Sequence, residues 1–252
     1  MYLQRTVTYS IRGIIMVENY SKQIKVGTKK SHSAAENTKF VASFLRGVVD
    51  KESYRTLVAN LYFVYSALED VAGHLKDNPE VSPILSDALN RHDALVKDLN
   101  YFYGEGWHET IYPSPATKQY IERIREVGRG DHQYLFVGHH YTRYMGDLSG
   151  GQILKGIAQK SLKLGDDAFN FYDFKDIESA TTFKDFYRRN IDTLPVTQKQ
   201  FDAIIVEANH AFRLNMYMFD ELAGDAAKST LQIVLGLLGD FFSEMIVSKR
   251  FR

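Results

Sequence analysis

The stretch Tyr141-Thr-Arg-Tyr-Met-Gly-Asp-Leu-Ser-Gly-Gly-Gln152 places three glycines and one carboxylate, Asp147, between two segments with helical patterning. Glycine inside a helix costs roughly 1 kcal/mol relative to alanine, so its repeated use needs a physical reason. Gly146 and Gly150 are four residues apart and share one helix face, where bare backbone leaves room for a bulky partner. Two interpretations are open: one long bent helix with an accessible face, or two helices joined by a glycine cap at Gly150.

Helical patterns fill the rest of the chain and strand patterns are scarce, which predicts an all-α fold in a single domain. Helices are expected over residues 20–47, 51–76, 84–103, 114–130, 134–164, 179–191 and 197–224. The clearest starts are Asp50, Ser114 before a proline, and the capping box that opens at Thr197.

The composition narrows the class of protein. The chain has 252 residues, enough for one large core, and its 31 Lys+Arg balance 31 Asp+Glu, so no basic field favours nucleic acid. There is no cysteine, which excludes disulfides and thiolate metal sites and suits a reducing compartment.

The two ends of the chain are expected to lie outside the main domain. Residues 1–17 are basic with no acid but have no signal-peptide core, so we expect an N-terminal extension. Residues 18–224 would be the main domain. Residues 225–252 include an apolar run, 231–247, that acids interrupt, which predicts an amphipathic terminal helix or tail rather than a transmembrane anchor.

A second pattern places charged side chains around a histidine on one helix face. Lys25, Lys29, His32 and Glu36 fall on one stripe of the first predicted helix. A neutral imidazole can ligate iron, and a carboxylate one turn away can orient it. The lysines would place positive charge beside a ligand that carries carboxylates. Spacing leaves one alternative open, a solvated basic face with an incidental histidine.

Other motifs suggest an anion-binding pair or a metal site. Lys184 and Arg188 form a second cationic pair at i, i+4, which could close around carboxylates or phosphates. Glu207-xx-His210 matches half of a helical di-iron site, but the other half begins at Glu105, between two glycines in a predicted loop. The adjacent His139 and His140 should face different sides of a helix and so not share one metal.

Several stretches together resemble the haem oxygenase family. They are Gly27-Thr-Lys-Lys-Ser-His-Ser-Ala-Ala-Glu-Asn37, Leu61-Tyr-Phe-Val-Tyr-Ser-Ala-Leu-Glu69, the glycine-rich stretch quoted above, Phe183-Lys-Asp-Phe-Tyr-Arg188 and Ala211-Phe-Arg-Leu-Asn215. The similarity runs from about residue 21 to residue 222. Met145 stands where the family usually has leucine, a swap of similar volume. The resemblance implies that haem lies between a proximal helix and a kinked distal helix.

The resemblance also implies a role for each matching residue. His32 would ligate the iron of haem b, and Glu36 would bond to the other ring nitrogen. The haem propionates would be held by Lys25, Lys29, Lys184 and Arg188. The backbone from Gly146 to Gly150 would lie against the porphyrin, and Asp147 would organise distal water. The remaining implied site residues are Tyr65, Tyr141, Arg143, Phe212 and Asn215.

The implied activity is the opening of haem, both cofactor and substrate, to biliverdin IXα with release of carbon monoxide and ferrous iron. Dioxygen is consumed, and the electrons come from outside because the chain carries no flavin or nicotinamide motif. The resemblance favours a soluble ferredoxin as donor, a downstream bilin reductase as a further partner, and a cytoplasmic or plastid-stromal location. A non-catalytic haem-binding or haem-sensing protein is the alternative, against which the presence of Asp147 argues.

Overall fold

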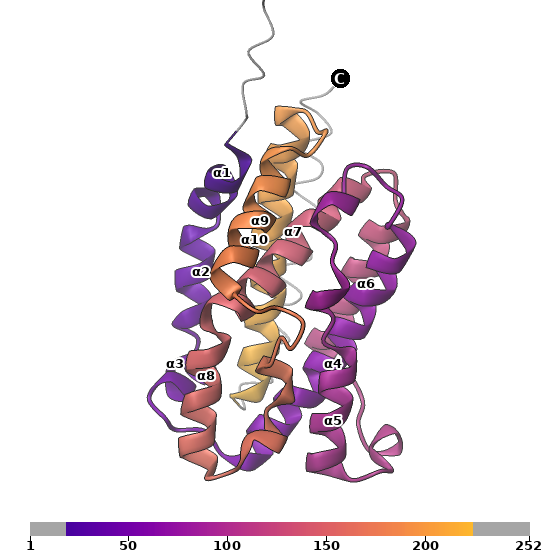
Figure 1. The fold of residues 1–252 in the computed structure, drawn as a ribbon. Coiled ribbons are helices and arrows are strands. Elements are labelled where there is room, and N and C mark those ends of the chain that lie inside the picture. Colours follow the sequence, from indigo (N-terminus) through magenta and orange to yellow (C-terminus); the bar gives the residue numbers. More distant parts are fainter. Residues whose placement is uncertain (1–18, 224–252) are drawn as a thin grey trace, which may run out of the picture.

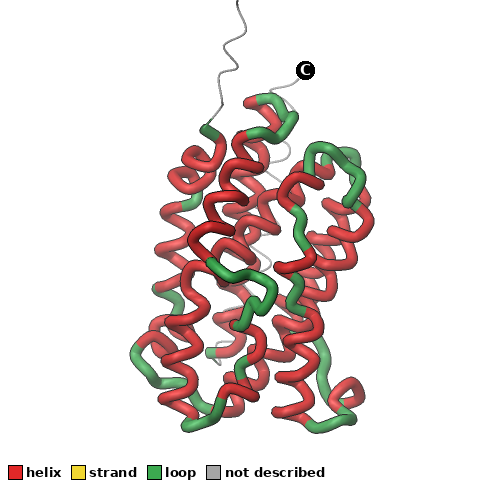
Figure 2. The backbone as a smooth tube through the Cα atoms, in the orientation of Figure 1, coloured by secondary structure: helices red, strands yellow, loops and turns green. Residues whose placement is uncertain are grey.

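In the computed structural model, which describes residues 19–223, every regular element is helical (Figures 1 and 2). The α-helices are α1 (Tyr20–Gly27), α2 (Lys29–Glu36), α3 (Lys39–Leu45), α4 (Lys51–His74), α5 (His92–Tyr103), α6 (Pro115–Arg129), α7 (Phe136–His140), α8 (Gly146–Leu162), α9 (Ala180–Asp192) and α10 (Gln198–Leu222). A π-helical turn, η5 (Tyr141–Met145), joins α7 to α8. The predicted all-α fold is confirmed. The terminal helix expected over 231–247 lies outside the described residues.

Short 3₁₀ helices fill the connections. They are η1 (Ser82–Ile84), η2 (Asp87–Leu89), η3 (Trp107–Glu109), η4 (Gln133–Leu135), η6 (Asp166–Ala168) and η7 (Asn170–Tyr172). The helix expected over 84–103 therefore begins only at His92. Between residues 19 and 223, no helix has both the length and the apolarity needed to cross a membrane.

The helix starts that the sequence signals most clearly are confirmed. The Asp50 carboxylate accepts a hydrogen bond from the backbone N–H of Ser53 at 2.8 Å and opens α4. The Ser114 hydroxyl accepts the N–H three residues later and opens α6. Thr197 and Gln200 each accept a bond from the other's backbone N–H, completing the capping box of α10.

The prediction of one helix over residues 20–47 is wrong, because the segment forms α1, α2 and α3. At the first break the Thr28 hydroxyl bonds to the carbonyl of Ile24 at 2.7 Å. At the second, the Asn37 amide bonds to the carbonyl of Ser33 at 2.7 Å. Such side chains compete with the backbone for helical carbonyls. The charged stripe therefore crosses from α1, which carries Lys25, to α2.

Helix α10 runs the length of the fold and packs against α1, α2, α3, α6 and α7 (Figure 1). The contact with α7 is a backbone contact. A Cβ placed on Gly138 would lie 2.8 Å from the backbone nitrogen of Ala208 and 2.9 Å from the carbonyl oxygen of Ile204. Only glycine allows this approach, so α10 fixes the start of the segment that leads into η5 and α8.

The glycine-rich stretch belongs to one continuous helical path. α8 runs through Gly150 and Gly151 to Leu162, so the alternative of a glycine cap at Gly150 is wrong. The irregularity lies earlier, in the π turn η5. π turns occur mainly as single turns inside α-helices, often at functional sites. α8 ends at Lys163, whose left-handed backbone (φ 55°) terminates the helix.

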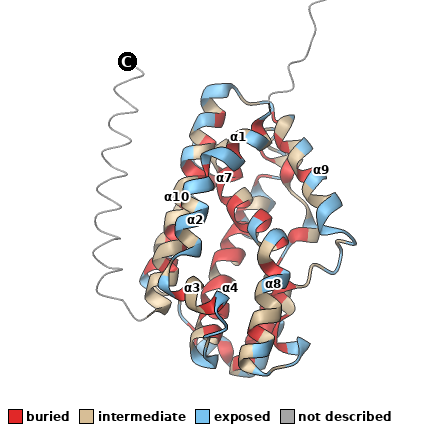
Figure 3. Ribbon diagram, turned by 90° about the vertical axis from the view of Figure 1, so that its left-hand side faces the viewer, coloured by how far each residue is buried: buried red, intermediate tan, exposed pale blue. Residues whose placement is uncertain are grey.

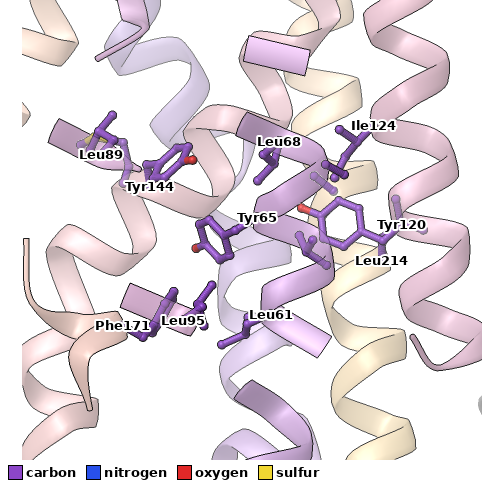
Figure 4. Close-up of a cluster of buried hydrophobic side chains, with 14 of the residues drawn as sticks. Leu61, Tyr65, Leu68, Leu89, Leu95, Tyr120, Ile124, Tyr144, Phe171 and Leu214 are labelled. Carbon is purple, nitrogen blue, oxygen red and sulfur yellow. The ribbon is translucent and has the colours of Figure 1, made fainter. Parts of the chain in front are cut away.

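The core on the inner side of this path is rich in tyrosine. Figure 4 shows Tyr65 of α4 between Tyr144 and Phe171 on one side and Tyr120 and Leu214 on the other. The Tyr65 ring meets those of Tyr144 and Phe171 edge to face, with centroids 5.5 and 5.3 Å apart. Tyr65 is fully buried, so its hydroxyl needs a polar partner inside the protein.

Candidate functional site

That partner is Asp147. The Tyr65 hydroxyl donates a hydrogen bond to the Asp147 carboxylate, and the Arg143 Nε–H donates to the Tyr65 oxygen at 3.1 Å. A second N–H of Arg143 donates to Asn215 Oδ1 at 2.5 Å, and its third nitrogen lies 3.8 Å from Asp147 Oδ1. The structure thus brings four of the predicted site residues together from α4, η5, α8 and α10.

Burial controls the protonation of this network. It raises the pKa of Asp147, against the charge of Arg143 and the Tyr65 hydrogen bond, which lower it. It also raises the pKa of Tyr65 well above its usual value. For Arg143, burial acts to lower the pKa, but its contacts with Tyr65 and Asp147 raise it overall. The network therefore holds a charged guanidinium, a neutral phenol and a carboxyl group whose protonated form is favoured more than usual.

The helix face next to the network is bare. A Cβ placed on Gly146 or Gly150 would meet no atom within 4 Å, as both glycines face open space. Gly151 points the other way, where a Cβ would lie 3.3 Å from the Tyr172 ring. There the Gln152 amide donates to the Tyr172 carbonyl at 2.9 Å. α8 is thus packed on one side and open at Gly146 and Gly150, which suits a flat molecule lying against the backbone.

His32 lies on α2, on the same side of the molecule as α8 (Figures 1 and 3). Its Nδ1 is 3.6 Å from a carboxylate oxygen of Glu36, and each of these side chains is 56% exposed. The Phe212 ring of α10 meets the imidazole at an angle of 69°, with centroids 5.9 Å apart. Within residues 19–223 no hydrogen bond engages Nε2, so this nitrogen is available to a ligand.

The predicted cationic residues lie on three helices. Lys25 and Lys29 are exposed on α1 and α2, and Lys184 is half-buried on α9. In the described part of the chain these three make no ion pair, whereas the Arg188 guanidinium lies 2.6 Å from Asp185. Helix α1, which carries Lys25, packs against α9, which carries Lys184 and Arg188.

Tyr141 links the two sides of the site. It shares a hydrogen bond with Thr28, at the junction of α1 and α2, and feels the positive charge of Arg188. Burial raises the pKa of Tyr141, which both neighbours act to lower. The Tyr141 phenol therefore connects the π turn to the junction of α1 and α2, and lies within range of the charge of Arg188 on α9.

Some residues of the network are absent from the sequence prediction. The Asn215 amide donates to the Tyr120 hydroxyl at 3.3 Å, which extends the network to α6. The positive charge of Arg91 also acts to lower the pKa of Asp147. Tyr120 lies on an apolar helical stripe that is typical of core residues, and Arg91 precedes α5 with no motif around it, so no local signal identifies either.

A buried ion-pair cluster holds α7 to α10 just before η5. Glu207 accepts hydrogen bonds from the Arg123 guanidinium at 2.9 and 2.8 Å and pairs with His139 Nε2 at 2.8 Å. Burial acts to raise the pKa of Glu207, but these two partners lower it far below the usual value. Glu207 thus pairs with Arg123 and His139. The adjacent His140 faces another way, as expected, with Nδ1 2.8 Å from the Tyr187 hydroxyl.

Comparisons with known proteins point to one family. A family model described as "Heme oxygenase" matches residues 18–221. The "Heme oxygenase" of Porphyra purpurea is 47% identical over 234 residues, covering 92% of this chain and 99% of that protein. Heme oxygenase-1 from the cyanobacterium Synechocystis, solved in complex with heme, superposes with a TM-score of 0.80 at 47% identity, covering 87% of this chain and 99% of that chain. Synechocystis heme oxygenase-2, solved with heme and NO, gives 0.79 at 39% identity, covering 81% and 85%.

Proposed function

Because the chain belongs to the haem oxygenase family, we propose that it converts haem to biliverdin IXα, carbon monoxide and ferrous iron, using dioxygen and external electrons. The observation that carries this proposal is the Tyr65–Arg143–Asp147 network beside the open backbone of Gly146 and Gly150. A protein that only binds haem needs the open face but not a buried carboxyl group held next to it.

The residues present fit haem on both sides. His32 would bind the iron through Nε2, since Glu36 faces Nδ1 and would orient the ring. Phe212 would limit rotation of the imidazole. Bound haem would supply the iron at which dioxygen is reduced, and its ring is what is oxidised. The propionates would be bound by the cationic side chains Lys25, Lys29, Lys184 and Arg188.

Asp147 is the proposed proton donor of the site. The Arg143 N–H occupies the Tyr65 oxygen, so the Tyr65 proton is directed at Asp147 and fixes its orientation. The raised pKa of Asp147 favours holding a proton that water can carry to dioxygen. Asn215 holds Arg143 in place, and Tyr141 ties this side to the proximal junction.

The electron donor, the location and the domain limits are further parts of the proposal. A ferredoxin is supported by the absence of a flavin or nicotinamide motif and by the similarity to cyanobacterial and red algal relatives. The same relatives support a cytoplasmic or plastid-stromal location and a bilin reductase that consumes the product. Residues 18–224 would form the catalytic domain, with 1–17 and 225–252 outside it.

The test is turnover of Asp147→Ala with haemin and a ferredoxin system, read by chromatography of the bilin product. Haem binding should persist while biliverdin formation falls by about 10²- to 10⁴-fold, the usual range for losing a positioned acid. Asp131→Ala, an exposed carboxylate, is the matched control. Wild-type rates in Asp147→Ala would contradict the proton role. A wild-type protein that binds haemin but makes no bilin, with ferredoxin or with ascorbate, would support the non-catalytic alternative.

A further inference from the structure

Helix α2 contributes no residue to the buried core, since none of its eight residues is buried. One side-chain amide of α10 hydrogen-bonds to it. The Ser31 hydroxyl donates to Asn209 Oδ1 at 2.5 Å, and the Asn209 nitrogen donates to the carbonyls of Gly27 at 3.1 Å and Ile205 at 2.8 Å. A single side chain therefore holds the last residue of α1, the first turn of α2 and its own helix together.

The contact is close as well as polar. A Cβ on Gly27 would lie 2.5 Å from Cγ2 of Ile205, so glycine is what lets the end of α1 lie against α10. With Gly27 of α1 pressed against α10 and Ser31 bonded to Asn209, the chain is fixed on α10 just before α2 and again within its first turn. The first point sets where α2 begins, and the second sets which way its first turn faces.

We propose that Asn209 is a positioning residue for His32, an inference that rests on the proposed role of His32 as the iron ligand. His32 follows Ser31 directly, so fixing Ser31 on α10 sets the direction of the imidazole, about 100° further around the helix. Phe212, three residues after Asn209 on the same helix, then contacts the imidazole edge. The Glu36 pair is exposed and cannot fix the helix, since such pairs contribute little.

Asn209→Leu removes the three hydrogen bonds at similar volume. We expect haem to dissociate about 10-fold faster, the lower end of the usual effect of residues that orient a metal ligand. We also expect the iron–imidazole stretching band of the ferrous protein to broaden or shift in resonance Raman spectra. Ser31→Ala should give a smaller change in the same direction. Ser33→Ala, on the same helix but exposed and outside the contact with Asn209, should leave both readouts unchanged.

Hydrogen exchange of the apoprotein gives a readout independent of haem. Amides of α2 should lose protection in Asn209→Leu and in Ser31→Ala, while those of α4 keep theirs. Wild-type dissociation and an unchanged band in Asn209→Leu would overturn the inference, as would equal effects in Ser33→Ala. His32→Ala, measured in parallel, distinguishes a failure of the proposed ligand role of His32 from a failure of the positioning role of Asn209. If that variant keeps the band, the proposed function of His32 fails. If it loses the band while Asn209→Leu matches the wild type, only the role of Asn209 fails.

Discussion

Helix α2, on the proposed proximal side of haem, and the turn η5, on the proposed distal side, differ in burial. None of the residues of α2 is buried, and His32 is paired with Glu36 in solvent at 3.6 Å. In η5, Thr142, Arg143, Tyr144 and Met145 are all buried. The side chains of the distal network are fixed by the core, whereas the proximal histidine is presented by a helix that depends on α10.

This difference predicts how each side responds to substitution. Removing a buried charged partner leaves the other partner uncompensated in a low-dielectric interior, which is costly. Removing an exposed partner leaves the other one hydrated, which costs little. Substitutions on the distal side should therefore lower the free energy of unfolding, whereas proximal ones should change ligand binding while the fold persists.

The largest effect is expected at Glu207, which anchors α7 just before η5. Glu207→Ala leaves the buried His139 without its carboxylate, and leaves the half-buried Arg123 with only the exposed Glu126 as a partner. The free energy of unfolding should fall by about 3–5 kcal/mol in urea titrations. Glu126→Ala is the control, since Glu126 also pairs with Arg123 but is 67% exposed, and it should cost less than about 1 kcal/mol. Equal losses in both variants would contradict the contrast between buried and exposed partners.

A smaller loss of stability is expected at acidic pH, through His140 at the end of α7. Burial lowers the pKa of His140 from 6.5 to about 3, so the imidazole is neutral in the folded protein but takes up a proton in the unfolded chain. Its contribution to stability is complete above pH 6.5 and is lost as the pH falls towards 3. At pH 5 the loss amounts to about 2 kcal/mol.

His140→Phe should remove this dependence. Unfolding free energies measured between pH 6.5 and 5 should fall less steeply in the variant than in the wild type. His74→Phe replaces an exposed imidazole and should keep the wild-type slope. A variant slope equal to that of the wild type would show that His140 is not held neutral by burial.

The smallest effect on stability is expected on the proximal side. Glu36→Ala should change the free energy of unfolding by less than about 0.5 kcal/mol, because the pair is exposed. Haem should nevertheless dissociate about 10-fold faster, since the imidazole loses its orienting partner. Stopped-flow transfer of haem to an acceptor globin measures the rate, and Glu52→Ala, another exposed helix pair, is the control. Unchanged dissociation in Glu36→Ala would show that Glu36 does not orient the ring.

What the sequence predicts well is local. Asp50, Ser114 and Thr197 each satisfy backbone groups within three residues, so the starts of α4, α6 and α10 follow from adjacent letters. The open face of Gly146 and Gly150 follows from helical spacing.

What it misses depends on distant segments. The helix breaks at Thr28 and Asn37 are hidden by good helical patterning on either side of each. The first break also depends on Asn209 of α10, far along the chain, whose amide donates to the carbonyl of Gly27. The pairing of His139 with Glu207 spans 68 residues. Glu207 and His210 match a metal motif by spacing, and His210 Nδ1 does lie 3.7 Å from Glu207 Oε1, but the same carboxylate also accepts hydrogen bonds from the distant Arg123.

The π turn η5 determines the direction in which the following helix face points. A π turn contains one residue more than an α turn, and one residue corresponds to about 100° of rotation. Everything after Met145 is therefore turned by that angle relative to an uninterrupted continuation of α7. If the same residues continued α7 as a regular α-helix, Gly146, Asp147 and Gly150 would keep their mutual spacing but face another direction. Deleting one residue together with the π turn would leave that direction unchanged. The direction of the open glycine face thus depends on the type of turn between α7 and α8 as well as on the residues that form the face.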